Sequence, residues 1–242
     1  MDKTFIILYS LRQFCSALKQ DLNHKGPMTK FDKTYWDKNY SEPMSMDGIG
    51  NAKAHVNYLV SFLEIEHVDI GTVIDLGFGY GHLFREMLKA FIPHRAVGIE
   101  PSPYAFKKAR VHKLRPVIST DLVLYEEDLL TWCRTDRKKN NLFDLAICTS
   151  VFQYLTDKEL KEIIPILGKR IKYIYLTVPT NIELGRQVSE LEFKDEYAIH
   201  RTREQYQKLL KPHFTFVSSR VLESKHFFDE ESTAFTDLLF RN

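Results

Sequence analysis

Asp75 and the glycines that follow it have the residue types and the spacing to hold a nucleotide-like ligand. The apolar run that ends at Asp75 leads into Gly77, Gly79 and Gly81, and an apolar-periodic segment begins at Leu83. A tight turn from a strand into a helix needs glycine, both for positive φ and for close approach of the backbone to a ligand. The sequence therefore predicts a glycine-rich cradle for a cofactor between a strand and a helix.

Acidic side chains also end the next two predicted strands. Glu100 stands about twenty residues after the glycines, where a carboxylate can accept hydrogen bonds from both hydroxyls of a ribose. Asp128 ends the third predicted strand, where it can accept from an exocyclic adenine amine, and Glu127 takes this place if the strand is shifted by one residue. Because parallel strands end at the same edge of a sheet, these carboxylates are expected to lie on one ligand-binding edge.

The glycine spacing differs from the dinucleotide fingerprint G-x-G-x-x-G. The third glycine comes one residue early, at Gly81, and His82 stands in the expected place. Asp75 lies two residues before the first glycine, where a carboxylate is unfavourable for a pyrophosphate and suitable for a cationic ligand or an amino group. A nicotinamide cofactor is therefore disfavoured.

The composition is that of an ordinary globular chain. It has 242 residues, enough for one domain with a full core, and a formal net charge of +2, which indicates no strongly charged partner such as a nucleic acid or a membrane. Three cysteines and nine scattered histidines show no disulfide framework and no metal-ligand spacing. No stretch is long enough to span a membrane. We therefore expect a cytoplasmic protein without a metal site.

Strand-like and helix-like segments alternate from about residue 51. The predicted strands cover residues 72–76, 95–100, 122–126, 142–148, 171–178, 214–222 and 235–240. The predicted helices cover residues 51–66, 83–91, 103–113, 156–167 and 202–211. This alternation predicts an α/β fold, a doubly wound and mostly parallel sheet with helices on both faces. The last two strands, joined through residues 223–233, are expected to form an antiparallel edge.

Two segments lie outside this alternation. Residues 1–50 precede it and are predicted to be an N-terminal extension and a possible lid, whereas residues 51–242 form the domain. Residues 179–201 form a long insertion after the fifth strand. Long loops at the carboxyl ends of parallel strands commonly carry substrate specificity. The insertion is therefore assigned to the substrate side of the site.

The set of Asp75, the three glycines, Glu100 and Asp128, followed by FDLAICTSVFQYL at residues 143–155, resembles the class I S-adenosylmethionine-dependent methyltransferases. The resemblance covers roughly residues 51–242 and implies a Rossmann-like fold. It implies S-adenosyl-L-methionine as the cofactor and S-adenosyl-L-homocysteine as the product. The residues to which it assigns cofactor contacts are Asp75, Gly77, Phe78, Gly79, Gly81, Glu100, Pro101, Ser102, Asp128, Leu129, Thr149, Ser150, Tyr35 and Trp36.

The resemblance also implies which part of the cofactor each group would hold. Asp75 and the glycine-loop backbone would hold the methionine part, as would Thr149 and Ser150, while Glu100 would hold the ribose and Asp128 the adenine amine. Tyr35 and Trp36 belong to the segment YWDKNY, which resembles family segments that lie over the cofactor. The alternative for these two aromatics is ordinary packing.

Methyl transfer is an in-line displacement, so the enzyme mainly aligns the nucleophile, the methyl carbon and the sulfur. Aromatic faces can stabilise the sulfonium, and the candidates are Phe78, Tyr80, Phe152 and Tyr154. An oxygen or nitrogen acceptor must also lose a proton, and the candidate bases are Tyr197 and His200 in the insertion. The alternative for His200 is a surface loop histidine.

The favoured acceptor is an oxygen or nitrogen atom of a small molecule enclosed under the two covering segments. The chain has Thr149-Ser150-Val151-Phe152 where methyltransferases of base amines carry Asn/Asp-Pro-Pro-aromatic, which disfavours DNA. The basic run from Lys107 to Arg115 is interpreted as a solvated face, with RNA contact as the alternative. A methyltransferase acting on protein or RNA, and a non-catalytic cofactor-binding module, therefore remain open.

Overall fold

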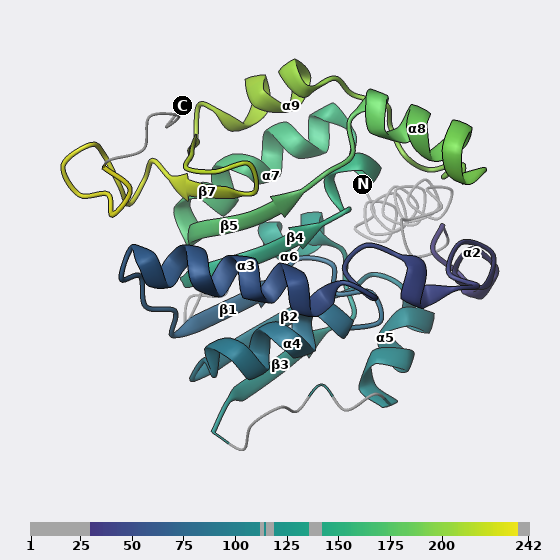
Figure 1. Cartoon of the computed structure of the whole chain (residues 1–242), viewed down its shortest axis with the longest axis horizontal. Helices are drawn as coiled ribbons and strands as arrows, with labels where there is room; N and C mark the ends of the chain where they lie inside the picture. Colours follow the sequence, from purple (N-terminus) through teal and green to yellow (C-terminus); the bar gives the residue numbers. More distant parts are fainter. Residues whose placement is uncertain (1–29, 112–113, 115–118, 136–141, 237–242) are drawn as a thin grey trace, which may run out of the picture.

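The computed structural model describes residues 30–111, 114, 119–135 and 142–236, and it contains a seven-stranded sheet in the order β3-β2-β1-β4-β5-β7-β6 (Figure 1). The strands are β1 (Thr72–Asp75), β2 (Arg95–Ile99), β3 (Asp121–Tyr125), β4 (Phe143–Thr149), β5 (Ile171–Thr177), β6 (Phe214–Phe216) and β7 (Val221–Ser224). The helices are α2 (Lys33–Asn39), α3 (Ala52–Ile65), α4 (His82–Phe91), α5 (Pro103–Val111), α6 (Leu129–Arg134), α7 (Asp157–Arg170), α8 (Asn181–Leu191) and α9 (Arg203–Leu210), with the 3-10 turns η2 (Pro43–Ser45) and η3 (Phe152–Tyr154).

Strands β1 to β5 are parallel, and β7 pairs antiparallel with both β5 and β6. The predicted α/β fold, mostly parallel with an antiparallel terminal strand, is confirmed. The strand order reverses between β1 and β4, where Asp75 is in register with Ile147. In open α/β sheets, ligands bind beyond the carboxyl ends of the strands at such a reversal. The topology therefore places the candidate site beyond Asp75.

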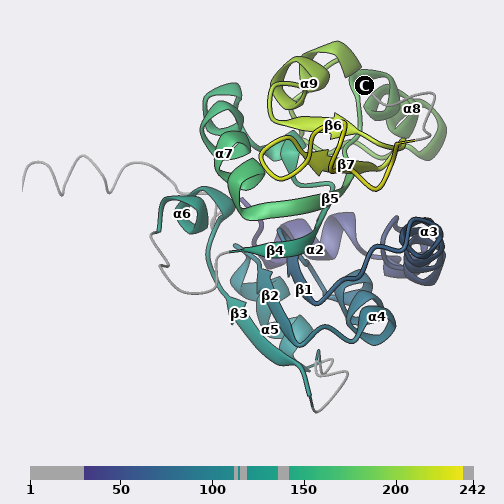
Figure 2. The ribbon, with the colours of Figure 1, turned by 90° about the vertical axis from the view of Figure 1, so that its left-hand side faces the viewer.

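Helices cover both faces of the sheet because its central strands are apolar on both sides. In β4, Leu145 and Ile147 join the core formed with α3, α4 and α5, whereas Ala146 and Cys148 join the core formed with α6, α7 and α9. This alternation is the period of two that a strand imposes on its side chains. Figure 2 shows the two layers, with α6 and α7 on one side of the sheet and α3 and α4 on the other.

The C-terminal strands differ from the prediction. The run 214–222 is not one strand, because a turn separates β6 from β7. In this turn the Ser218 Oγ accepts hydrogen bonds from the backbone N–H groups of Arg220, at 3.2 Å, and of Val221, at 2.9 Å. A serine that bonds its own backbone in this way competes with strand pairing. The predicted strand 235–240 is wrong at its first two residues, which are not in a strand, and the rest lies outside the described residues.

Three of the described helices were not predicted, α2, α6 and α8, and α8 occupies about half of the insertion at residues 179–201. The predicted capping boxes are present: Thr156 with Glu159 begins α7, and Thr202 with Gln205 begins α9. The first of these helices continues through Pro165 to Arg170, beyond its predicted end.

The remaining sequence expectations concern membranes, metals and cysteines. Within the described ranges, no helix combines the length and the apolar character that crossing a bilayer requires. The same ranges contain no cluster of His, Cys, Asp and Glu side chains that could hold a metal ion. Cys133 and Cys148 are buried free thiols, and Cys15 lies outside the described part of the chain, as do residues 1–29 of the N-terminal extension.

Candidate functional site

The glycine loop, residues 77–81, is the turn between β1 and α4. Gly77, Gly79 and Gly81 have φ values of +151°, +53° and +76°, as the sequence predicts, and α4 begins directly after Gly81. A Cβ atom on Gly77 would lie 2.6 Å from a methyl carbon of Val151, and one on Gly79 would lie 3.3 Å from the Trp36 ring. The loop is therefore in close contact with the segment after β4 on one side and with α2 on another.

Glu100, directly after β2, supports the glycine loop from below. Its two carboxylate oxygens accept hydrogen bonds from the backbone N–H groups of Gly79 and Ser102, each at 2.8 Å. The side chain is 4% exposed, and burial raises its pKa to about 7 despite these two hydrogen bonds. A carboxylate has about four acceptor positions, so two remain for other donors. The geometry fits the ribose role that the resemblance implies.

Asp75 is a second buried carboxyl group at this edge. Its Oδ1 accepts from the Gly77 N–H at 3.2 Å. Burial raises the pKa of Asp75 well above its usual range, and the nearby Glu100 raises it further. Two buried carboxyl groups in one place are stabilised when a cationic group binds between them.

Asp128 forms the N-cap of α6. Its Oδ1 accepts from the Thr131 N–H at 2.8 Å, and its Oδ2 accepts from the Thr131 hydroxyl at 2.7 Å. Leu129 is 4% exposed and packs in the core with α7. Asp128 is thus held in place at the end of β3 by its own helix. Glu127 is half-buried beside it.

α2 lies directly against the glycine loop. Tyr35 and Trp36 are each 6% exposed. The Trp36 indole N–H donates to the Ser102 Oγ at 2.8 Å, and its ring centroid lies 4.7 Å from that of Tyr80. The turn after β2 and α2 therefore pack together against the glycine loop.

The segment after β4, residues 150–155, forms the other wall of the loop. Ser150 has a left-handed backbone with φ +55°, and its N–H donates to the Thr177 carbonyl of β5 at 2.8 Å. Non-glycine residues in this conformation carry strain, which is concentrated at functional sites. Thr149 lies beneath the 43–51 segment, since a Cβ atom on Gly48 would be 4.0 Å from its hydroxyl.

Residues at the start of α2, in the turn after β4 and in the insertion meet at an aromatic junction of Phe31, Tyr35, Tyr154, Asp195 and Tyr197. The Tyr154 hydroxyl donates to the Asp195 Oδ2 at 2.6 Å, and the Tyr35 hydroxyl donates to the same oxygen at 3.2 Å. Ring centroids lie 4.9 Å apart between Phe31 and Tyr154 and 5.7 Å apart between Tyr35 and Tyr197. Burial raises the pKa of both Tyr35 and Tyr154. α2 and α8 both lie on the right of Figure 1, the side on which β5 leads into the insertion.

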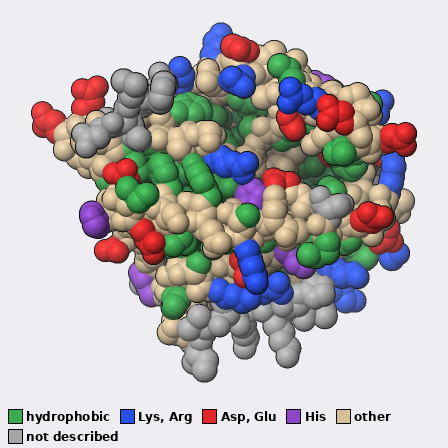
Figure 3. Space-filling model, viewed as in Figure 1, with side chains coloured by type: hydrophobic (Ala, Val, Ile, Leu, Met, Phe, Trp, Pro, Cys, Tyr) green, Lys and Arg blue, Asp and Glu red, His purple; other side chains and the backbone are tan. Residues whose placement is uncertain are grey.

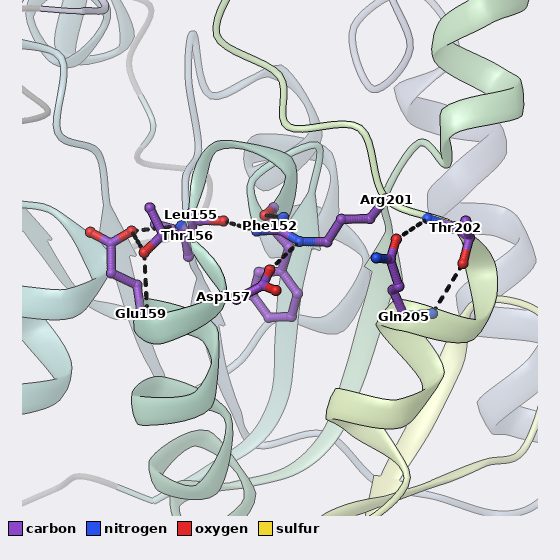
Figure 4. Close-up of polar contacts among 8 residues, drawn as sticks. All are labelled: Phe152, Leu155, Thr156, Asp157, Glu159, Arg201, Thr202 and Gln205. Atoms are coloured by element: carbon purple, nitrogen blue, oxygen red, sulfur yellow. Dashed lines mark hydrogen bonds and ion pairs between the residues drawn. The ribbon is translucent and has the colours of Figure 1, made fainter.

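Arg201, at the end of the insertion, fastens this segment to the residues after β4 (Figure 4). Its guanidinium donates to the Phe152 carbonyl at 3.3 Å, to the Leu155 carbonyl at 2.6 Å and to Asp157 Oδ1 at 2.7 Å. The Arg201 side chain is 3% exposed, whereas that of Asp157 is 65% exposed. The contact with the Phe152 carbonyl is therefore shielded from solvent, whereas the other two are partly buried.

Arg201→Ala is expected to lower the free energy of unfolding by about 2–4 kcal/mol, because the buried carbonyls of Phe152 and Leu155 lose their charged donor. Arg201→Lys should restore little of it, since one ammonium cannot reproduce the fork geometry. The matched control is Asp157→Asn, which removes the exposed partner and should cost less than about 1 kcal/mol. Urea unfolding of the three variants tests this, and equal losses for Arg201→Ala and Asp157→Asn would contradict it.

The structure separates the predicted catalytic and aromatic candidates. Tyr197 is half-buried in the aromatic junction, and His200 is exposed beside Arg201. Phe78 and Phe152 are buried in the two cores, so their rings do not line the loop, whereas Tyr80 and Tyr154 pack around α2.

Two polar features at the same edge were missed from the sequence. Gln153 is 3% exposed, and its Oε1 has no hydrogen-bond partner among the described residues. On the α3 face, His55 bonds the Asp47 carboxylate through Nε2 at 2.9 Å and the Tyr175 hydroxyl through Nδ1. Arg220 donates to the Tyr175 hydroxyl at 3.1 Å. Figure 3 shows basic, acidic and histidine side chains next to one another near the middle of this face.

The methyltransferase domain family model matches residues 73–171, from β1 to the start of β5. No curated protein shows a significant match to the chain. One similar solved structure is the small RNA methyltransferase HEN1, with a TM-score of 0.54 and 18% identity over 74% of this chain and only 26% of that chain.

Two further similar structures contain bound S-adenosylhomocysteine (SAH). Magnesium protoporphyrin IX methyltransferase (ChlM) from Synechocystis PCC 6803 has a TM-score of 0.53 and 16% identity, over 81% of this chain and 96% of that one. The plantazolicin methyltransferase BpumL has a TM-score of 0.58 and 13% identity, over 76% and 72%.

At these identities the structural likeness establishes the fold, and the family match establishes the kind of domain that β1 to β5 form. The sheet order, the glycine loop and the carboxylates that end β1 and β2 agree with the structural likeness and with the family match. Residues 73–171 therefore match a methyltransferase domain, and the chain has the Rossmann-like fold of structures that bind SAH.

Proposed function

We propose that this methyltransferase transfers its methyl group to an oxygen or nitrogen atom of a small-molecule acceptor. The observation that carries the proposal is the contact of two covering segments beside the glycine loop, where the Tyr35 hydroxyl of α2 donates to Asp195 of the insertion at 3.2 Å. A site roofed by two segments suits a ligand that is mostly enclosed. It suits a long polymer less well, because a polymer needs an open groove.

The residues around the loop fit the cofactor. Glu100 is a buried carboxylate with acceptor positions to spare for ribose hydroxyls, and Asp75 is a buried carboxyl group suited to the methionine ammonium. Gly77 and Gly79 let the backbone approach the methionine part closely. Asp128 would accept from the adenine amine, with Leu129 beside it, and Pro101 and Ser102 would line the ribose turn.

When bound, the cofactor supplies an electrophilic methyl group on a sulfonium that is an excellent leaving group. The chain therefore contributes position more than chemical activation. The aromatic junction and α2 exclude water from the region above the loop. The fixed backbone of Ser150 holds the segment after β4, with Tyr154, against the loop. A carboxylate or hydroxyl of the junction removes the acceptor's proton.

The acidic character of the insertion argues against an RNA acceptor. Residues 181–197 contain five carboxylate side chains and two basic ones. Such a segment repels a phosphate backbone, which binds through basic side chains. Because HEN1 acts on small RNA, as its name states, RNA stays the alternative to test, together with protein.

Calorimetry with S-adenosylmethionine, SAH and NAD, followed by a methyl-transfer screen against small-molecule, peptide and RNA acceptors, tests the proposal. We expect both sulfur compounds to bind and NAD not to bind. Methyl transfer to a small molecule would support the proposal. Transfer confined to RNA or protein would overturn it, and cofactor binding without transfer to any acceptor would favour a non-catalytic binding module.

Cofactor affinity is expected to rise with pH. Burial raises the pKa of Glu100 to about 7, so the free protein carries this group protonated in mild acid. The ribose role needs the ionised carboxylate, so below this pKa the affinity for SAH should fall by up to about tenfold per pH unit and level off above about pH 8. Calorimetry from about pH 5 to pH 9 measures this profile.

The raised pKa of Glu100 also makes stability depend on pH, in the direction opposite to cofactor affinity. An acid whose folded-state pKa lies above its unfolded value binds more protons when folded, so it favours the folded chain at low pH. From this group alone, the unliganded protein should lose stability as the pH rises from about 4 to about 7. Glu100→Gln should flatten both profiles. A wild-type affinity independent of pH in this range would refute the assignment.

A further inference from the structure

The aromatic junction lies close to the glycine loop. Val151, in the segment after β4, lies against the Gly77 backbone, and Trp36 of α2 lies against Gly79. Tyr154 lies three residues after Val151, and Tyr35 lies directly before Trp36. The hydroxyls of both tyrosines donate to Asp195. The junction is therefore joined through neighbouring residues to both contacts of the glycine loop.

The junction presents electron-rich groups. Asp195 provides one carboxylate, and its Oδ1 also accepts from the Tyr197 N–H at 3.1 Å, so the side chain is fixed. Four aromatic rings, those of Phe31, Tyr35, Tyr154 and Tyr197, pack against one another, and three of these residues bond Asp195. A carboxylate and aromatic faces in one place attract a cation, because ring quadrupoles and the anion both favour positive charge.

Gln153 is the independent observation. Its side chain is 97% buried, yet within the described part of the chain its Oε1 accepts no hydrogen bond. A buried carbonyl oxygen without a donor costs about 1–3 kcal/mol. The Gln153 main-chain carbonyl accepts from the Ile199 N–H at 2.8 Å. This bond fastens Gln153 to the insertion four residues after Asp195. An oxygen of this kind is suited to an N–H donor of a ligand.

The charge around the junction has the same preference. The five carboxylates of residues 181–197 lie along α8 and the turn that leads to Asp195. A local excess of negative charge raises the concentration of cations at a site and lowers that of anions. It also holds an amine in its protonated form until a base removes the proton.

We propose that the acceptor of this methyltransferase is a primary or secondary amine, bound in the aromatic junction with its N–H groups donating to Asp195 and to Gln153 Oε1; the inference rests on the proposed function. The bound ammonium gives one proton to the Asp195 carboxylate and becomes a neutral amine. The nitrogen lone pair forms the N–C bond as the C–S bond breaks, and that bonding pair stays on sulfur. The products are a methylated ammonium and SAH, and Asp195 returns its proton to solvent.

The test compares two probes of nearly equal shape, 2-phenylethylamine and 2-phenylethanol, by calorimetry on the full chain saturated with SAH. We expect the amine to bind at least about tenfold more tightly, as a charged hydrogen bond and a cation–π contact together imply. Asp195→Asn should abolish this preference and leave the affinity for SAH unchanged. Glu196→Gln, which removes the exposed carboxylate next to Asp195, is the matched control and should preserve the preference.

Gln153→Met separates binding from folding. Because the Gln153 Oε1 has no partner, its replacement by an apolar side chain of similar length should leave the thermal midpoint unchanged or raise it. The same change should weaken amine binding about threefold to tenfold. A purely structural role would not couple a stable variant to weaker amine binding.

The outcomes are distinct. If SAH does not bind the wild-type chain, the proposed function fails before this inference is reached. If SAH binds but the alcohol binds as tightly as the amine, or neither probe binds at millimolar concentration, the amine site is overturned. It is also overturned if Asp195→Asn and Gln153→Met both leave the preference for the amine intact.

Discussion

Glu100→Ala is expected to weaken SAH binding by roughly 100-fold or more. The carboxylate is proposed to accept both ribose hydroxyls, and each charged hydrogen bond contributes about 1.5–3 kcal/mol. The change also leaves the backbone N–H groups of Gly79 and Ser102 without their acceptor, which loosens the glycine loop. Calorimetry with SAH at about pH 8, where the wild-type carboxylate is ionised, measures the loss.

Two variants keep this result interpretable. Glu100→Gln retains one carbonyl oxygen and should lose about tenfold in affinity, between the wild type and Glu100→Ala. Glu126→Ala removes an exposed carboxylate beyond the end of the neighbouring strand β3 and should bind SAH as the wild type does. If Glu100→Ala folds and binds SAH within about threefold of the wild type, the ribose is held elsewhere.

Gly77→Ala is expected to lower the free energy of unfolding by about 2–4 kcal/mol and to remove measurable cofactor binding. The residue has φ +151°, a conformation that only glycine adopts readily, and the new Cβ atom would lie 2.6 Å from a methyl carbon of Val151. Either the loop or the segment after β4 must move. Since both are proposed to contact the cofactor, the effect on binding should exceed the effect on stability.

A double variant divides the effect into its two causes. Val151→Ala removes the colliding methyl groups, so combining it with Gly77→Ala should recover part of the lost stability, while the backbone strain remains. Gly185→Ala is the control, because this glycine lies in α8 with open space around it, and alanine there should be neutral or stabilising by up to about 1 kcal/mol. Additive losses for Gly77→Ala and Val151→Ala would show that no clash occurs.

The central site could be predicted because its signals are local in the sequence. The glycines at 77, 79 and 81 and the acids that end β1 and β2 each follow from a strand, a turn and a fixed position in the sheet. The C-terminal hairpin was mispredicted for a local reason as well. Hydrophobic residues stand at both ends of the segment 214–222, but the Ser218 hydroxyl between them accepts hydrogen bonds from two backbone N–H groups and forms a turn.

The aromatic junction could not be predicted because it is made by contacts between distant segments. Tyr35 and Asp195 are 160 residues apart, and no periodic pattern connects them. In the insertion, too, the sequence does not indicate which side chains are buried, because the segment has no regular hydrophobic period. The sequence predicts His200 as a candidate base, yet His200 is exposed, and the neighbouring Arg201 is buried and makes three hydrogen bonds.

The network of Asp47, His55, Tyr175 and Arg220 can be completed only late in biosynthesis. Asp47 and Arg220 belong to opposite ends of the described chain, and they meet through a tyrosine in the middle of β5. A ribosome releases β1 to β4 long before the turn that carries Arg220 emerges. Because contacts between distant residues form only after a large loop has closed, the bond from Arg220 to Tyr175 is made only when the C-terminal hairpin has paired with β5. A nascent chain can thus have its glycine loop formed while this network still lacks Arg220.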